Sequence, residues 1–220
     1  MILAVVSGKG GVGKSTISFE LGAELGAVVV DADLGMANLP YAPGPDLHDV
    51  LAGRADPTEA VREGGPVTIL PCGRTLAGAR AADVRRLAET LRAVEATYGD
   101  VVVDCPAGMR ADAGVPLAVA DACLVVASPK QYALADAVRT RELARELDCG
   151  LVAVAVNRAV DDPPLDAFAD VLGAPATSIP ADSRLRTALE RFEPVVSESP
   201  NRLVSTRLRE LASAVRVCRR

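Results

Sequence analysis

The chain has 220 residues, of which half are hydrophobic but only 3% aromatic, and its formal net charge is −5. This length suits a single domain, expected to span residues 1–220, with an aliphatic core. No apolar run approaches the roughly 18–20 residues of a membrane span, and the first residues predict a strand instead of a signal peptide, so we expect a cytoplasmic protein.

Apolar runs alternate with helical patterns along the whole chain. Several runs are almost continuous Val, Leu and Ala, which is typical of strands covered on both faces. The alternation predicts an α/β fold, with a doubly wound, mostly parallel sheet of about seven or eight strands, helices on both faces, and ligands at the carboxyl ends of the strands. The expected strands are 2–6, 27–31, 67–70, 100–104, 122–127, 151–156 and 176–179. The expected helices are 15–26, 81–97, 131–147, 165–172, 183–191 and 200–217, with shorter turns near 47–52, 58–63 and 112–119.

A phosphate-binding loop follows the first expected strand. Its sequence matches G-x-x-x-x-G-K-[ST] and lies between a strand and a helix, which is the setting that this motif requires. Glycines let backbone N–H groups crowd around phosphate oxygens, and the helix N-terminus attracts negative charge. Lys14 can reach the terminal phosphates, and the Ser15 hydroxyl can bind Mg²⁺. We expect the loop residues Gly8, Lys9, Gly10, Gly11, Val12, Gly13, Lys14 and Ser15 to hold a nucleotide.

Lysine usage makes this loop unusual within the chain. The sequence holds 24 basic residues, and only Lys9, Lys14 and Lys130 are lysines. A compact ammonium group and a planar guanidinium are not equivalent in a tight phosphate cradle. The placement of two of the three lysines in one loop therefore favours a nucleotide site over a glycine-rich turn with incidental charge.

Aspartates stand at the ends of two expected strands. Asp31 and Asp33 lie two residues apart, so they point the same way if the strand continues and would both face the phosphates and the metal. Asp104 ends the next long apolar strand, where a carboxylate can support Mg²⁺. The turn at 105–108 can present backbone N–H groups near a γ-phosphate and act as a switch. Turn-forming aspartates are the alternative interpretation.

Three motifs, in this order along the chain, resemble those of the MinD/ParA family of deviant Walker A ATPases, which are P-loop NTPases. Residues 9–16 resemble the family's phosphate loop, 31–38 its first switch and 104–108 its second switch, nearest to the MinD branch. The resemblance covers essentially the whole chain. It implies a slow ATPase that uses ATP/ADP and Mg²⁺, forms a homodimer when ATP is bound, and positions or regulates a partner assembly, in cell division or a similar process. It also implies an unidentified regulatory protein that accelerates hydrolysis.

The resemblance also implies a role for each residue of the site. Lys9 would cross to the phosphates of the partner subunit, Lys14 would bind those of its own subunit, and Thr16 would contact the α-phosphate. Asp33 would orient the attacking water. The expected catalytic residues are therefore Lys9, Lys14 and Asp33, and the expected Mg²⁺ residues are Ser15, Asp33 and Asp104, with the aspartates acting through water.

A base-binding site is implied near the other end of the chain. Asn157 and Arg158, at the end of the sixth expected strand, resemble the adenine-reading pair of the family, and 179–182, which includes Pro180, resembles the segment that borders the base. An Asn amide can complement an adenine edge, although an Asn at a strand end is otherwise an ordinary turn residue.

The basic C-terminal region leaves a second function open. Residues 183–220 hold nine arginines and four glutamates, a balance that permits weak contact with a membrane surface or DNA or forms solvated helix faces. A ParA-like DNA-partition ATPase would use such a region for sequence-independent binding at the nucleoid. The sequence ends near the last expected helix, without the membrane-inserting tail of the best-known MinD proteins. This departure argues against cycling at the membrane, while a peripheral location at the membrane or the nucleoid stays open.

Other branches of the same fold are disfavoured. Metal or cluster delivery needs paired cysteines, and no two of the five cysteines have C-x-x-C spacing. Ligases of the dethiobiotin synthetase type use a phosphate loop without the extra lysine, so Lys9 argues against them. We expect buried free thiols at Cys123 and Cys149, a packing role for Cys105, and a surface or capping role for His48.

Overall fold

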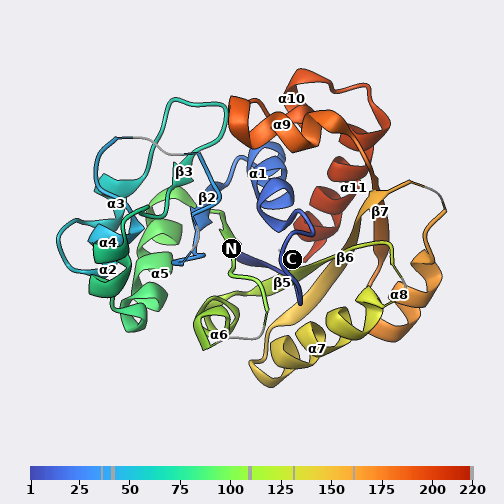
Figure 1. Cartoon of the computed structure of the whole chain (residues 1–220), viewed down its shortest axis with the longest axis horizontal. Helices are drawn as coiled ribbons and strands as arrows, with labels where there is room; N and C mark the ends of the chain where they lie inside the picture. Colours follow the sequence, from blue (N-terminus) through green and yellow to red (C-terminus); the bar gives the residue numbers. More distant parts are fainter. Residues whose placement is uncertain (36, 41–42, 109–110, 131, 161, 219–220) are drawn as a thin grey trace.

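The computed structural model describes the chain except for residues 36, 41–42, 109–110, 131, 161 and 219–220. Within the described residues, seven strands form one sheet in the order β3-β2-β4-β1-β5-β6-β7, and every pairing between them is parallel (Figure 1). The strands are β1 (Ile2–Val6), β2 (Val28–Asp31), β3 (Ile69–Leu70), β4 (Val101–Asp104), β5 (Ala122–Ala127), β6 (Gly150–Ala159) and β7 (Ala176–Pro180). The predicted α/β fold is confirmed.

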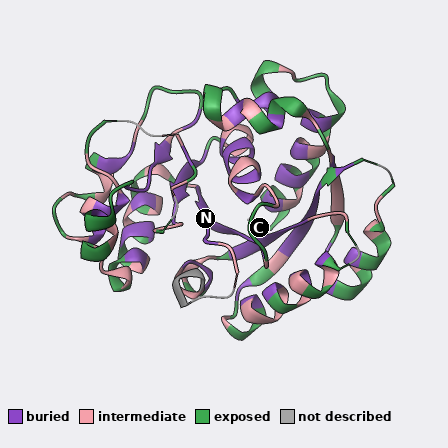
Figure 2. Ribbon diagram, in the orientation of Figure 1, coloured by how far each residue is buried: buried purple, intermediate pink, exposed green. Residues whose placement is uncertain are grey.

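Helices cover both faces of this sheet. One face carries α1 (Lys14–Leu25), α9 (Ser183–Arg191), α10 (Val195–Glu198) and α11 (Leu203–Val217). The other face carries α2 (Leu47–Leu51), α3 (Pro57–Ala60), α5 (Leu87–Tyr98), α6 (Ala111–Val119), α7 (Ala133–Glu146) and α8 (Leu165–Leu172). Strands β1 to β5 and the middle of β6 are buried, whereas the edge strand β7 is mostly half-buried (Figure 2). Burial is expected for β-branched and aliphatic runs between two helical layers.

Alternation along β1 divides the core between the two faces. Ile2, Ala4 and Val6 pack with the α5 side, whereas Leu3 and Val5 pack with the α1 side. The last helix, α11, buries the apolar stripe predicted from its spacing, which consists of Val204, Leu208, Leu211 and Val215. It therefore docks on the sheet as expected.

The segment before α5 differs from the prediction of one helix over 81–97. The structure has α4 (Leu76–Ala81), a 3₁₀ turn η1 (Val84–Arg86), and then α5. Ala82 is extended, and the Asp83 side chain accepts the N–H of Arg85, so a new turn starts there. Side chains such as Asp83 favour caps over helix interiors. The short helices α4 and α10 were not predicted.

The strand register places the candidate site. Asp104 is paired with Val5 of β1 on one side and with Asp31 of β2 on the other. The carboxyl ends of β1, β2 and β4 therefore meet at one point of the sheet edge, where ligands bind in folds of this kind.

Candidate nucleotide-binding site

The loop between β1 and α1 opens the N-terminus of α1 toward a cavity. No side chain caps this helix, and Gly13 precedes it in a left-handed conformation with φ of 94°. A Cβ atom on Gly13 would lie 2.3 Å from Nδ2 of Asn157, so this position has no space for a side chain. Free N–H groups at a helix N-terminus are a ready anion-binding site.

Lys14 and Asp104 form a buried ion pair beneath the loop. Nζ of Lys14 lies 2.8 Å from Oδ1 of Asp104, and their exposed fractions are 6% and 0%. Ser18 also donates to Oδ1 of Asp104, at 3.2 Å. Burial opposes the charge of Lys14, but the nearby Asp104 carboxylate outweighs it and raises the pKa of Lys14. The cation is therefore fixed at the sheet edge beside the cavity.

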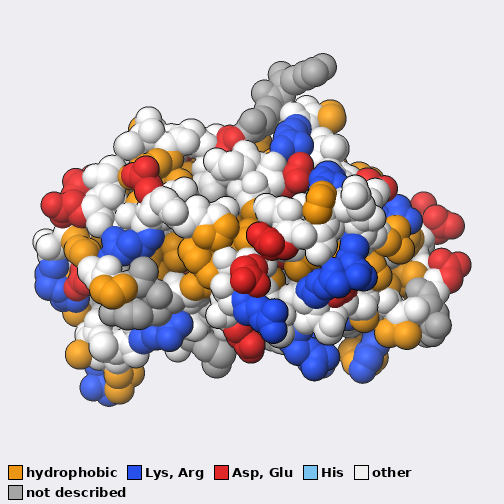
Figure 3. All heavy atoms as spheres, turned by 90° about the horizontal axis from the view of Figure 1, so that it is seen from above, with side chains coloured by type: hydrophobic (Ala, Val, Ile, Leu, Met, Phe, Trp, Pro, Cys, Tyr) orange, Lys and Arg blue, Asp and Glu red, His pale blue; other side chains and the backbone are white. Residues whose placement is uncertain are grey.

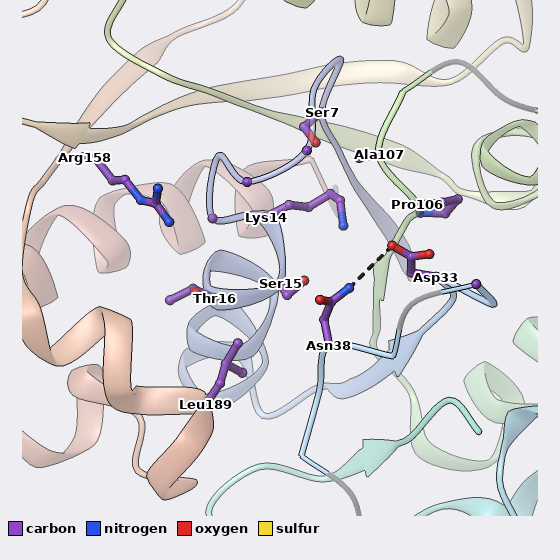
Figure 4. A pocket seen from close by; sticks show the side chains of 14 residues that line it. Ser7, Lys14, Ser15, Thr16, Asp33, Asn38, Pro106, Ala107, Arg158 and Leu189 are labelled. Atoms are coloured by element: carbon purple, nitrogen blue, oxygen red, sulfur yellow. Dashed lines mark hydrogen bonds between the residues drawn. The ribbon is translucent and has the colours of Figure 1, made fainter. Parts of the chain in front are cut away.

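The cavity has a volume of about 450 Å³ and is drawn in Figure 4. Eight of the predicted site residues line it: Gly10, Gly11, Gly13, Lys14, Ser15, Thr16, Asp33 and Arg158. Ser7, Asn38, Pro106, Ala107 and Leu189 also line it but were not predicted as site residues. Ser7 directly precedes the phosphate loop, and Asn38, Pro106 and Ala107 lie within the two switch motifs. The sequence could therefore have indicated these four residues as part of the site. Leu189 comes from α9 and gave no sequence signal.

The other side of the loop faces away from this cavity. Gly8, Lys9 and Val12 lie against the β5–α7 connection together with Tyr132. Nζ of Lys9 lies 5.3 Å from the centre of the Tyr132 ring, and a Cβ atom on Gly8 would lie 2.6 Å from the carbonyl oxygen of Asp136. The two lysines of the loop therefore point to different sides.

Asp31 and Asp33 do not face the site together, which corrects one expectation. The strand ends at Asp31, whose fully buried carboxylate accepts backbone N–H groups from Asp33 at 3.2 Å, Asn38 at 2.8 Å and Leu39 at 3.0 Å. Burial, followed by the negative charge of the neighbouring Asp104, raises the pKa of Asp31 to about 7. Asp31 thus organises the segment after β2, and only Asp33 lines the cavity.

Asp33 stands at the cavity edge opposite the loop. Its Oδ2 accepts a hydrogen bond from the side-chain nitrogen Nδ2 of Asn38 at 3.4 Å, as the dashed line in Figure 4 shows. Ser15 and Lys14 extend from α1 on the facing side. This arrangement puts a hydroxyl, an ammonium and a carboxylate around one space, which is the donor set suited to a phosphate with its cation.

A second cavity of about 440 Å³ adjoins the first. Gly13, Thr16 and Arg158 line both, and Asn157, Pro180 and Arg186 line the second. The Asn157 amide donates to the carbonyl of Val12 at 2.8 Å and accepts from the N–H of Arg158 at 2.9 Å. Asn157 therefore ties β6 to the phosphate loop, and its role toward adenine stays a prediction.

Arg158 has a left-handed backbone, with φ of 63°. Such a conformation is costly for a residue other than glycine and persists where the surroundings enforce it. Arg158 lines both cavities and therefore lies where they meet.

Two further expectations concern residues near the site. Cys105, Cys123 and Cys149 are buried free thiols as predicted; burial raises the pKa of Cys105, and its thiol contacts the carbonyl of Val103. His48 was expected at the surface or as a cap, and this is wrong: it is 2% exposed. Two glycines from other elements make room for its ring, which no local pattern reveals.

In the part of the chain that the structure describes, no three His, Cys, Asp or Glu side chains come together as metal ligands. Among the same residues, no helix is long and apolar enough to cross a membrane.

Comparison with known proteins agrees with these features. A family model of CobQ/CobB/MinD/ParA nucleotide-binding domains matches residues 3–195. An uncharacterized ATP-binding protein of Methanocaldococcus jannaschii is 32% identical over 98% of this chain and 88% of its own length. The cell division ATPase MinD of Pyrococcus furiosus has a similar structure, with a TM-score of 0.90, 30% identity and 98% of each chain covered. The septum site-determining protein MinD of Pyrococcus horikoshii, solved with Mg-ADP, gives a TM-score of 0.89 and 30% identity over 97% of this chain and 95% of the other.

Proposed function

Because the chain belongs to the CobQ/CobB/MinD/ParA nucleotide-binding family and has the fold of the MinD ATPases, we propose that it is a Mg²⁺-dependent ATPase acting as an ATP-driven dimerising switch. Residues 1–220 would form one ATPase domain that hydrolyses ATP to ADP and positions or regulates another protein assembly. The observation that carries this proposal is the separation of the two loop lysines. Lys14 lines the cavity of its own chain, whereas Lys9 does not and remains available to a second copy.

Nucleotide binding would use both cavities. The N–H groups of the loop and of the α1 N-terminus bind the phosphates, with Lys14 and Thr16 beside them. The base enters the second cavity, between Asn157 and Pro180. Arg158 stands between these regions and can stack on the base or approach the phosphates.

Mg²⁺ would be held by the Ser15 hydroxyl together with phosphate oxygens. Oδ2 of Asp104 is buried and makes no hydrogen bond to any described residue, so it can accept one from water in the shell of the cation. When bound, the cation neutralises charge that develops on the phosphates. The relative from Pyrococcus horikoshii solved with Mg-ADP supports this cofactor assignment.

Hydrolysis would depend on Asp33. Its carboxylate lines the cavity opposite Lys14, so it can accept a hydrogen bond from a water molecule and orient that water toward the γ-phosphate. The Pro106–Ala107 segment lines the same cavity. This segment can follow the presence or loss of the γ-phosphate, which is how nucleotide switches change state.

A protein partner is favoured over DNA or a membrane surface. In the basic C-terminal region, Arg209 and Arg216 each lie 3.5 Å from Glu24, and Arg207 lies 2.8 Å from Glu210. Figure 3 shows acidic and basic side chains interspersed on one face instead of gathered by sign. Internal pairing leaves fewer positive charges for the counterion release that drives non-specific DNA binding.

Light scattering after size exclusion tests the proposed switch. The Asp33→Ala variant with Mg-ATP is expected to elute as a dimer, and with ADP as a monomer. Lys9→Ala in the same background should stay monomeric with ATP. A monomer under every condition would overturn the dimer proposal, whereas absent ATP turnover in the wild type would overturn the ATPase itself.

The partner can be sought with the same trapped variant. Affinity purification with Asp33→Ala and Mg-ATP, compared with the Lys9→Ala variant, should recover a protein that only the dimer retains. Adding that protein to the wild type should accelerate ATP turnover. DNA binding that strengthens with ATP at low salt would instead support the partition function.

A further inference from the structure

The single histidine of the chain is buried beside the segment that carries Asp33. His48 belongs to α2, a short helix whose first turn is closed by a capping box between Asp46 and Asp49. The N–H of Leu47 donates to the carbonyl of Pro71 at 2.9 Å, which fixes α2 to the end of β3. The imidazole therefore projects from a firmly held position.

Two glycines shape the space around the ring. A Cβ atom on Gly73 would lie 2.3 Å from Nδ1 of His48 and 2.8 Å from both carboxylate oxygens of Asp46. A Cβ atom on Gly78 would lie 2.9 Å from the same Nδ1. Any larger residue at Gly73 or Gly78 would displace the ring. These two glycines therefore provide the space that the imidazole occupies.

The polar contacts of the ring define its tautomer. Nε2 lies 3.1 Å from the carbonyl oxygen of Leu34 and 3.4 Å from the sulfur of Cys72, whereas Nδ1 is buried and has no hydrogen-bond partner among the residues that the structure describes. A carbonyl oxygen only accepts, so the Leu34 contact is a hydrogen bond only when Nε2 carries the proton. Cys72 then accepts a weak share of the same N–H.

Leu34 follows Asp33 directly, and several side-chain hydrogen bonds hold the segment after β2, including one from Arg74 to the carbonyl of Leu39 at 3.4 Å. Asp31 accepts three of its backbone N–H groups from within the segment, and His48 reaches its carbonyl from α2. We infer that His48 is a positioning residue, whose Nε2–H holds the Leu34 carbonyl and thereby sets Asp33 for hydrolysis. This role rests on the proposed ATPase function, and it couples α2 to the nucleotide site.

Nitrogen NMR can observe this hydrogen bond directly. The chain has one histidine, so a long-range ¹H–¹⁵N spectrum of ¹⁵N-histidine-labelled protein contains a single imidazole. The expected spectrum is that of the Nε2–H tautomer, and its Nε2 shift should change when Mg²⁺ and a non-hydrolysable ATP analogue are added. An Nδ1–H tautomer, or an unchanged shift at saturating analogue, would overturn the inference.

Two substitutions of equal length separate positioning from packing. His48→Gln keeps an N–H donor at the reach of Nε2, whereas His48→Met fills similar space without a donor. With Met, we expect kcat for ATP to fall about tenfold, the rate equivalent of one hydrogen bond, while KM stays within about twofold because no phosphate contact is lost. With Gln, kcat should stay within about threefold of the wild type.

The outcomes separate this inference from the proposed function. Equal losses in both variants, unchanged kcat with Met, or a change confined to KM would each overturn the positioning role while leaving the ATPase intact. If the wild type does not hydrolyse ATP, the proposed function fails, and the NMR measurement still decides whether His48 holds Leu34 and responds to nucleotide. If the Met variant does not fold, the kcat of the Gln variant and the imidazole tautomer of the wild type decide whether the inference holds.

Discussion

The phosphate loop and the segment after β2 lie on opposite sides of the same cavity, but they are held in different ways. On the loop side, Lys14 is buried and paired with Asp104, beneath a loop that runs directly into α1. On the other side, Asp33 is half-buried, and its segment is tied to Asp31 and His48 by individual hydrogen bonds.

This difference suggests that one side of the cavity binds the nucleotide and the other side responds to its hydrolysis. A buried ion pair is costly to break, because the remaining charge stays without a partner. A single hydrogen bond contributes roughly 1 kcal/mol, which is a small barrier to rearrangement. The loop side is thus suited to hold phosphates in one geometry, and the Asp33 side is suited to change when the γ-phosphate is lost.

Lys14→Met tests the rigid side and should have the largest effect. It leaves the buried Asp104 carboxylate unpaired, so the free energy of unfolding should fall by about 3–5 kcal/mol, and binding of a fluorescent ATP analogue should be lost. The matched control is Lys9→Met in the same loop, which should change stability by less than about 1 kcal/mol, because Lys9 is exposed and loses only a surface contact with the Tyr132 ring. Urea unfolding and nucleotide titration measure both. Equal stability losses would contradict the comparison.

Asp33→Asn tests the responsive side. If Asp33 orients the water as we propose, loss of its carboxylate should lower kcat at least about hundredfold, with stability within about 0.5 kcal/mol because the residue is half-buried. Asp31→Asn is the contrasting control. The two carboxylate oxygens of Asp31 together accept three backbone N–H groups, and Asn replaces one of them with an NH₂ group that cannot accept, so the substitution should reduce stability measurably. A kcat loss from Asp31→Asn with unchanged stability would reverse the assigned roles.

The same division explains how far the sequence predicts the site. The loop is contiguous, so its glycines, Lys14 and Ser15 are visible in one short motif. Asp104 is visible because it ends an apolar strand. The inward turn of Asp31 depends on N–H groups up to eight residues later, and strand alternation alone gave the wrong direction for this side chain.

Contacts between distant elements account for the remaining errors. The burial of His48 requires Gly73 and Gly78, and Leu189 reaches the cavity from α9. The helix boundary near 82–87 depends on the Asp83 cap competing with helical continuation. Each of these outcomes is decided by packing or hydrogen bonds that no local period encodes, whereas the α/β class and the parallel sheet follow from the alternation of apolar runs with helical patterns.

Glu20 tests whether the rigidity of α1 has a cost in stability. Its buried carboxylate accepts the N–H groups of Val195 at 2.8 Å and Val196 at 3.0 Å, yet burial outweighs these bonds and raises the pKa of Glu20 from 4.5 to about 7. Glu20 therefore contributes to the free energy of unfolding fully below pH 4.5, and this contribution is lost as the pH rises through 7. The loss is up to about 3 kcal/mol.

Glu20→Gln removes this titration. The difference in unfolding free energy between variant and wild type should shift in favour of the variant between pH 4.5 and pH 8, which urea unfolding across that range would measure. A difference that is constant with pH would show that Glu20 is ionised equally in both states, and that α1 is held to α10 without this cost.

Tyr132→Leu tests whether the Tyr132 ring restrains Lys9, the exposed lysine of the phosphate loop. This substitution should have the smallest effect. The Tyr132 ring lies near both Lys9 and Lys130, at 5.3 Å and 5.7 Å from their ammonium groups. Removing an exposed cation–π contact costs about 0.5–1 kcal/mol, and it would free Lys9 to reach a second copy. Because each dimer uses Lys9 from both subunits, two such contacts are relieved, and the dimerisation constant of the Asp33→Ala background with Mg-ATP should tighten about five- to thirtyfold, as measured by sedimentation. Tyr132→Phe keeps the ring and should match the parent. If the Leu and Phe variants have the same dimerisation constant, or if Leu weakens the dimer, the ring does not restrain Lys9. Lys9 is then no less available to the partner subunit than Lys14 is to the phosphates of its own chain.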